Sequence, residues 1–161
     1  RGAKLSAVKQ QGRGLRFTLQ EISPPHLPPP VEGKIHDNLA AIRDTLVVSN
    51  LAPGQYLLTV DGQAVAEGSH QQWAEGVAVD ASPAHKAAEA YRQKVNDKNL
   101  QFTYSWKALN QVHIVGERRS SASGKSLPEE VIAFGKLADQ RDEALQAGIE
   151  LKTREWRLVP Q

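Results

Sequence analysis

The chain has no cysteine among its 161 residues, which excludes disulfide bridges and thiolate metal sites. It contains no apolar run approaching the roughly 20 residues of a membrane-spanning helix, and no signal-like apolar segment. The formal net charge is only +2, whereas nucleic-acid-binding domains usually concentrate a larger excess of Lys and Arg on one face. We therefore expect a globular chain with no membrane span and no nucleic acid as a partner.

Known cofactor and metal motifs are missing as well. Gly124-Lys125-Ser126 has the end of a phosphate-binding loop, but that motif needs a glycine five positions earlier, where Arg119 stands. Gly12 and Gly14 lead into a strand rather than a helix, so they do not open a dinucleotide site. No two histidines have the helical spacing of metal ligands, and we interpret each as a surface or capping residue: His26, His36, His70, His85 and His113. We expect neither a metal nor a cofactor.

Methionine is also absent, even from position 1. The chain opens with Arg1-Gly2-Ala3-Lys4-Leu5, and this alternation of polar and apolar residues already has the pattern of a strand. The pattern favours a piece of a longer polypeptide. The alternative is a small methionine-poor protein that has lost nothing but its initiator.

Alternating residues predict an antiparallel β unit in residues 1–80. Leu15, Phe17 and Leu19 fall on one face of a strand and polar residues fall on the other, so the sheet should have one face in solvent. Asp61-Gly62 is a typical two-residue hairpin loop. We expect a hairpin and a three-strand meander, formed by residues 3–10 and 15–22 and by residues 45–49, 55–60 and 63–66. Five prolines in residues 23–30 predict an extended connector.

A long helix is expected over residues 83–111, because Ser82 is a suitable N-cap and Pro83 suits the first turn. Its apolar residues recur at spacings of three and four and form a stripe that we expect to be buried. This stripe needs a larger partner surface than a three-strand ribbon offers. It contains Ala88, Tyr91, Val95, Phe102 and Trp106.

A second helix is expected over residues 127–147, where Ser126 and Glu129 form a capping box. A short helix should begin after Ser69, which has Gln72 three residues later. The last residues should dock as a tail onto the body. The predicted class is α+β, with the small antiparallel sheet in residues 1–80 and a helical unit with its docking tail in residues 81–161.

Four side chains are candidates for a binding role. Arg118 and Arg119 stand beside two serines and could clamp an anion or touch a substrate rim, although a solvated basic loop explains them as well. Trp73 and Tyr104 could form a platform for sugar stacking together with other aromatic residues, and core packing is the alternative. No serine is marked as a nucleophile by a neighbouring base and an oxyanion site.

Several segments resemble the C-terminal region that follows the catalytic domain in bacterial SGNH/GDSL-type hydrolases. They are residues 14–19 (GLRFTL), 51–62 (LAPGQYLLTVDG), 73–77 (WAEGV) and 99–102 (NLQF), in that order. The family's nucleophile block, its oxyanion blocks and its Asp-x-x-His pair have no counterpart in this chain. The resemblance therefore implies a part of an esterase in which no catalytic residue is present.

By this resemblance, the chain is a structural accessory portion of a secreted or periplasmic ester hydrolase that acts on acylated carbohydrate. Its partner would be an upstream SGNH catalytic domain, in the same precursor or in a separate chain, and the chain alone should be inactive. The alternative is an independent module that binds carbohydrate or a protein. The exposure of Trp73, Tyr104 and Trp106 separates the two, because a coplanar exposed row favours carbohydrate binding and a buried trio favours packing.

Overall fold

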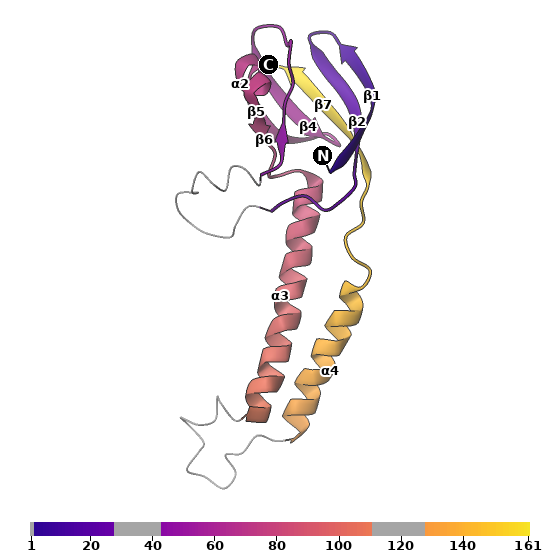
Figure 1. Cartoon of the computed structure of the whole chain (residues 1–161), viewed down its shortest axis with the longest axis vertical. Helices are drawn as coiled ribbons and strands as arrows, with labels where there is room; N and C mark the ends of the chain where they lie inside the picture. Colours follow the sequence, from indigo (N-terminus) through magenta and orange to yellow (C-terminus); the bar gives the residue numbers. More distant parts are fainter. Residues whose placement is uncertain (1, 28–42, 111–127) are drawn as a thin grey trace. The chain divides into compact units, whose positions relative to one another are not determined.

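The structure is a computed structural model that describes residues 2–27, 43–110 and 128–161. The chain divides into two units, Arg1–Glu89 with Ile149–Gln161, and Ala90–Gly148. The first unit contains the sheets and a short helix, and the second contains most of two long helices (Figure 1). The predicted α+β class with an antiparallel sheet is confirmed.

A five-stranded antiparallel sheet forms the centre of the first unit. Its strand order is β1 (Ala3–Gln11), β2 (Gly14–Glu21), β7 (Thr153–Pro160), β4 (Gln55–Val60) and β5 (Gln63–Ser69). The β4–β5 loop is Asp61-Gly62, and both residues have positive φ, 49° and 80°, as this hairpin turn requires. The two hairpins predicted from turn residues are therefore present.

The predicted three-strand meander is wrong. Its expected first strand is reduced to β3 (Thr45–Leu46), which pairs with β6 (Val77–Ala78) in a separate two-stranded sheet. The edge of β4 that β3 was expected to occupy is paired with β7 instead. A strand has two edges, and those of β4 are taken by β5 and β7, so no position remains for β3.

The predicted docking tail is also corrected. Residues 153–160 form β7, the central strand of the sheet, with Trp156 opposite Phe17 on one side and Leu158 opposite Leu58 on the other. The helical unit therefore does not extend over 81–161, since Ile149–Gln161 belongs with the sheet. Local periodicity indicates which residues share a face of a strand, but it does not indicate whether other strands pair with both of its edges.

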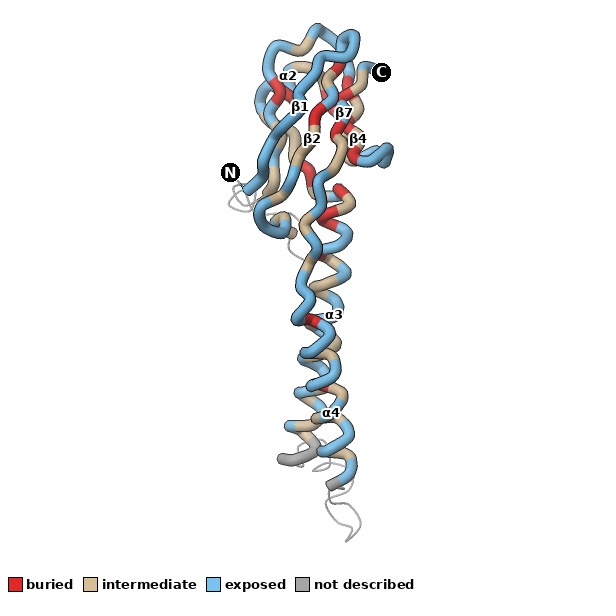
Figure 2. The backbone as a smooth tube through the Cα atoms, turned by 90° about the vertical axis from the view of Figure 1, so that its right-hand side faces the viewer, coloured by how far each residue is buried: buried red, intermediate tan, exposed pale blue. Residues whose placement is uncertain are grey.

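The core lies on one face of the sheet, where inward residues alternate along each strand. On β4, Tyr56, Leu58 and Val60 are fully buried, and red segments on β4 and β7 mark this core in Figure 2. The short helix α2 (His70–Glu75) adds Trp73, whose Nε1 donates to Gly68 O at 3.1 Å. The predicted capping box of Ser69 closes the start of α2. The opposite face carries polar contacts such as Arg157 with Glu155, 2.6 Å.

The second unit contains α4 (Pro128–Leu145) and the part of α3 (Pro83–Asn110) from Ala90 onward, and the two form an antiparallel pair. Tyr91 Oη donates to Leu145 O at 3.1 Å at one end of the pair. Near the other end, the rings of Tyr104 and Phe134 lie 5.6 Å apart. Both helices end within two residues of their predicted bounds.

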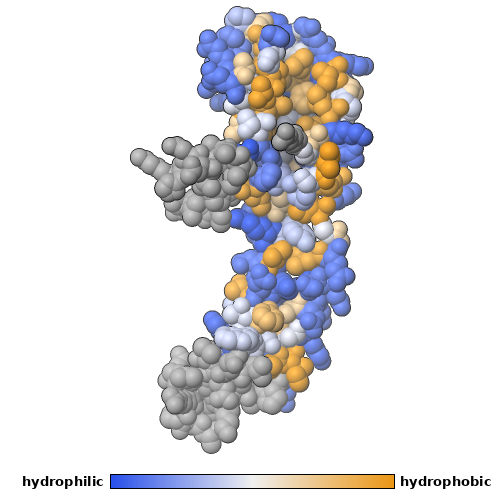
Figure 3. All heavy atoms as spheres, in the orientation of Figure 1, coloured by the Kyte–Doolittle hydropathy of each residue, from blue (hydrophilic) through white to orange (hydrophobic). Residues whose placement is uncertain are grey.

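The predicted apolar stripe of α3 is only partly buried. Ala88 is 4% exposed, whereas Phe102 and Trp106 are 61% and 52% exposed. Phe102 and Trp106 are four residues apart and share one face, while Ser105 donates to Val131 O of α4 at 3.1 Å. Phe102 and Trp106 are therefore not buried by the described part of the chain, and the expectation that a partner surface covers the stripe stays a prediction. In Figure 3, hydrophobic side chains (orange) are visible at the surface of the helical unit.

Candidate functional site

A cavity of about 510 Å³ lies within the first unit, beside the end of β2 and the start of α3. Its volume is in the range of small-molecule sites, about 300–1,000 Å³. Apolar and titratable side chains line it together, among them Leu19, Glu21, Asp44, Val79, Ser82, His85 and Trp156. This combination makes it the candidate site of the chain.

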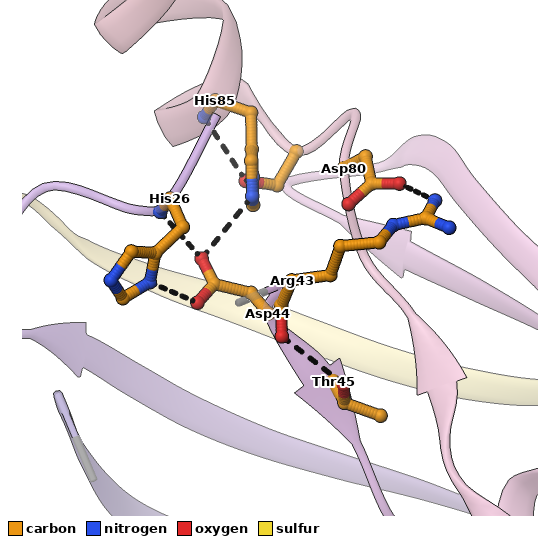
Figure 4. Close-up of polar contacts among 7 residues, drawn as sticks. His26, Arg43, Asp44, Thr45, Asp80 and His85 are labelled. Carbon is orange, nitrogen blue, oxygen red and sulfur yellow. Dashed lines mark hydrogen bonds and ion pairs between the residues drawn. The ribbon is translucent and has the colours of Figure 1, made fainter. Parts of the chain in front are cut away.

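Asp44 connects three segments at the cavity. Its Oδ2 accepts from the backbone N of His26 at 3.1 Å, and its Oδ1 lies 3.1 Å from His26 Nδ1 (Figure 4). His85 Nε2 lies 3.3 Å from Asp44 Oδ2. The backbone O of Asp44 accepts from Val79 N at 2.9 Å. The carboxylate thus holds the chain after β2 and the first turn of α3 close to the segment that precedes β3.

Ser82 and His85 form a buried pair at the start of α3, and they are 1% and 4% exposed. Ser82 Oγ accepts from the backbone N of His85 at 3.4 Å, as an N-cap does, and lies 2.7 Å from His85 Nδ1. With the imidazole proton on Nε2, the hydroxyl donates to Nδ1 and the Nε2–H faces the Asp44 carboxylate. The Nε2–H is too poorly aligned for a hydrogen bond, so the contact with Asp44 is electrostatic.

The row of Ser82, His85 and Asp44 contains the three residue types of a hydrolytic triad, but its geometry is that of a helix cap. Ser82 lines the cavity but is only 1% exposed, and its hydroxyl accepts from the first turn of α3 and contacts the His85 ring. A catalytic triad needs an accessible nucleophile next to an oxyanion site. The arrangement holds the helix start to Asp44.

Glu21 carries the perturbed carboxyl group of the cavity. Partial burial raises the pKa of Glu21 above 4.5, the charges of Asp44 and Asp61 raise it further, and Arg154 opposes the shift. Arg154 is itself paired with Asp61 at 2.9 Å. Arg43, the arginine of the cavity wall, is paired with Asp80. The positive charges of Arg43 and Arg154 are therefore each paired with a carboxylate.

The residues predicted as binding candidates do not form this site. Trp73 is 0% exposed and lies in the core of the first unit, and Tyr104 is 42% exposed on α3 in the second unit. Trp73 is therefore enclosed within its own unit and offers no exposed ring for stacking. Arg118 and Arg119 lie outside the described residues.

Sequence reasoning missed Glu21, Asp44 and the burial of His85. The interpretation of His85 as a capping residue is right in position, because it stands in the first turn of α3, but the residue is not at the surface. Ser82 followed by a histidine three residues later was the available signal. No pattern in the neighbouring sequence indicates a role for Asp44, because its contact with His85 depends on the tertiary structure.

Protonation of His85 should lower stability in mild acid. Burial holds the pKa of His85 below 6.5, with Asp44 opposing the shift and His26 adding to it. The unfolded chain then binds the proton at a higher pH than the folded chain, so stability falls as the pH drops from above 6.5 to the lowered pKa and then levels off. We expect urea unfolding of His85→Asn, which keeps an acceptor near Ser82, to depend less on pH in this window. Equal slopes for both proteins would contradict this.

Within residues 2–27, 43–110 and 128–161, no group of three His, Cys, Asp or Glu side chains is placed to hold a metal ion. No helix among these same residues combines the length and the hydropathy that crossing a bilayer requires.

Comparison with known proteins bears on the fold. No family profile matches the chain, and no curated protein matches it. Among solved structures, a gut microbial diltiazem-metabolizing enzyme is similar in fold, with a TM-score of 0.70 and 15% sequence identity. The similarity covers 99% of this chain and 46% of that enzyme, so this chain corresponds to about half of the enzyme's length.

Proposed function

We propose that this chain is a non-catalytic accessory portion of a larger SGNH/GDSL-type ester hydrolase, secreted or periplasmic, that acts on acylated carbohydrate. The observation that carries the proposal is the fold likeness, because nearly all of this chain matches less than half of a metabolizing enzyme. A fold that occurs as one part of an enzyme is consistent with the resemblance of residues 14–102 to the region after an SGNH catalytic domain.

The state of the candidate residues supports the same proposal. Ser82 lines the cavity but is only 1% exposed, and its hydroxyl caps α3, which is the state of a helix cap and not that of an accessible nucleophile. Phe102 and Trp106 expose apolar surface on one face of α3, and such surface is usual where another protein surface docks. In this proposal, the catalytic domain of the same enzyme covers it.

The alternative of an independent carbohydrate-binding module receives less support. Trp73 is buried and donates to Gly68 O, and Tyr104 is tilted by 59° against Phe134. Trp73 is thus withdrawn from any sugar-stacking surface, whereas Tyr104 and Trp106 are 42% and 52% exposed, so neither a buried trio nor an exposed row of three is present.

The proposal predicts that the chain alone does not hydrolyse esters. We expect turnover of 4-nitrophenyl acetate and of acetylated sugars to equal the uncatalysed background, for the chain and for its Ser82→Ala variant alike. Turnover by the chain that Ser82→Ala abolishes would show that the buried row is catalytic, and the proposal would fail. Turnover that survives in Ser82→Ala would point to another nucleophile and would equally contradict it.

A further inference from the structure

The cavity of the first unit contains a carboxyl group that has no ion-pair partner among the described residues. Glu21 lines the cavity at the end of β2. Among the described residues, its side chain forms no hydrogen bond and no ion pair. Placing an unpaired carboxylate in a partly dry site is costly, which is why its pKa is raised. An incoming positive charge would remove this cost.

Among the described residues, the charges around the cavity leave an excess of negative charge. Asp44 is a second carboxylate on the lining, and its charge acts on Glu21. The positive charge of Arg43 is matched by Asp80, and that of Arg154 by Asp61. His85 is neutral at pH 7 because its pKa is lowered. An anionic ligand would therefore meet repulsion, and a cation would meet two carboxylates.

Part of the lining is apolar and suits the body of an organic molecule. Leu19, Val79 and Trp156 line the cavity, and Val79 and Trp156 belong to the buried core.

We propose that this cavity is a binding site for an organic cation, an amine or a quaternary ammonium with an apolar body. Its charge pairs with the carboxylates of Glu21 and Asp44, and its apolar part packs on Leu19, Val79 and Trp156. The site differs from an acyl-transfer centre, and its occupancy does not depend on whether the chain belongs to an ester hydrolase.

The test is calorimetric titration of the whole chain with three probes of similar size, phenethylamine, phenethyl alcohol and phenylacetate. We expect phenethylamine to bind, the neutral alcohol to bind about tenfold or more weakly, and phenylacetate not to bind, because a charge-assisted pair in a partly dry site is worth at least about 1.4 kcal/mol. Similar affinities for the amine and the alcohol would overturn the proposal, as would no binding of amine at millimolar concentration.

The matched variants are Glu21→Gln, which removes the charge and keeps the shape, and Glu67→Gln on the exposed part of β5. Glu21→Gln should weaken phenethylamine about tenfold, whereas Glu67→Gln should leave it unchanged. Circular dichroism melting of both variants checks that the fold is intact. Equal affinity of Glu21→Gln and the parent chain would overturn the assignment. Equal weakening by both variants would overturn it as well, because the binding would then come from general charge attraction.

Discussion

Replacing Leu158 by alanine should lower the free energy of unfolding by about 2–5 kcal/mol, the usual cost of removing a fully buried leucine side chain. Leu158 is 0% exposed. It stands on the central strand β7, opposite Leu15 of β2 and Leu58 of β4. The cavity left by the truncation is bounded by strands on both sides, so the neighbouring side chains cannot collapse into it easily.

The matched control is Leu5→Ala on the edge strand β1, where the same atoms are removed from a side chain that is 58% exposed. Its effect should stay within roughly 0.5 kcal/mol, as for most surface substitutions. Urea unfolding followed by tryptophan fluorescence measures both, because Trp73 and Trp156 report on the sheet core. A small loss for Leu158→Ala would restore the interpretation of residues 149–158 as a tail that merely docks.

Gly14→Ala should be the second strongly destabilising change, by about 1–3 kcal/mol or more, as overpacking in a closed site usually is. Gly14 begins β2, and a Cβ added there would lie 2.1 Å from the backbone O of Leu158. A backbone atom in a paired strand cannot swing aside as the end of a side chain can. The substitution therefore has to displace β7 against β2.

Gly135→Ala is the control, because the nearest atom to its added Cβ is Ser105 Oγ at 3.7 Å, an ordinary contact. Gly135 lies inside α4, where alanine should stabilise the helix by up to about 1 kcal/mol. The two identical substitutions should thus move the midpoint of thermal unfolding in opposite directions. A Gly14→Ala variant as stable as the parent would mean that the β2–β7 pairing is looser than described.

Local signals were sufficient for the single elements. The helix bounds followed from Ser82-Pro83 and from the capping pattern near residue 127, and the hairpins followed from glycine-containing turns. The wet and dry faces of β2 followed from alternation, with Phe17 buried and Arg16 exposed. Each of these features depends on contacts between residues only a few positions apart, and the local pattern records those contacts directly.

The position of β7 and the cavity were decided by the tertiary structure. A strand formed by residues 153–160 has the same local pattern whether it lies at an edge or in the centre, so the sequence indicates an extended segment and not its neighbours. Glu21, Asp44 and His85 come from separate segments and meet because β2 ends, β3 begins and α3 starts around one cavity. The sequence determined the class and the elements of this protein, and long-range strand pairing decided which charges face one another.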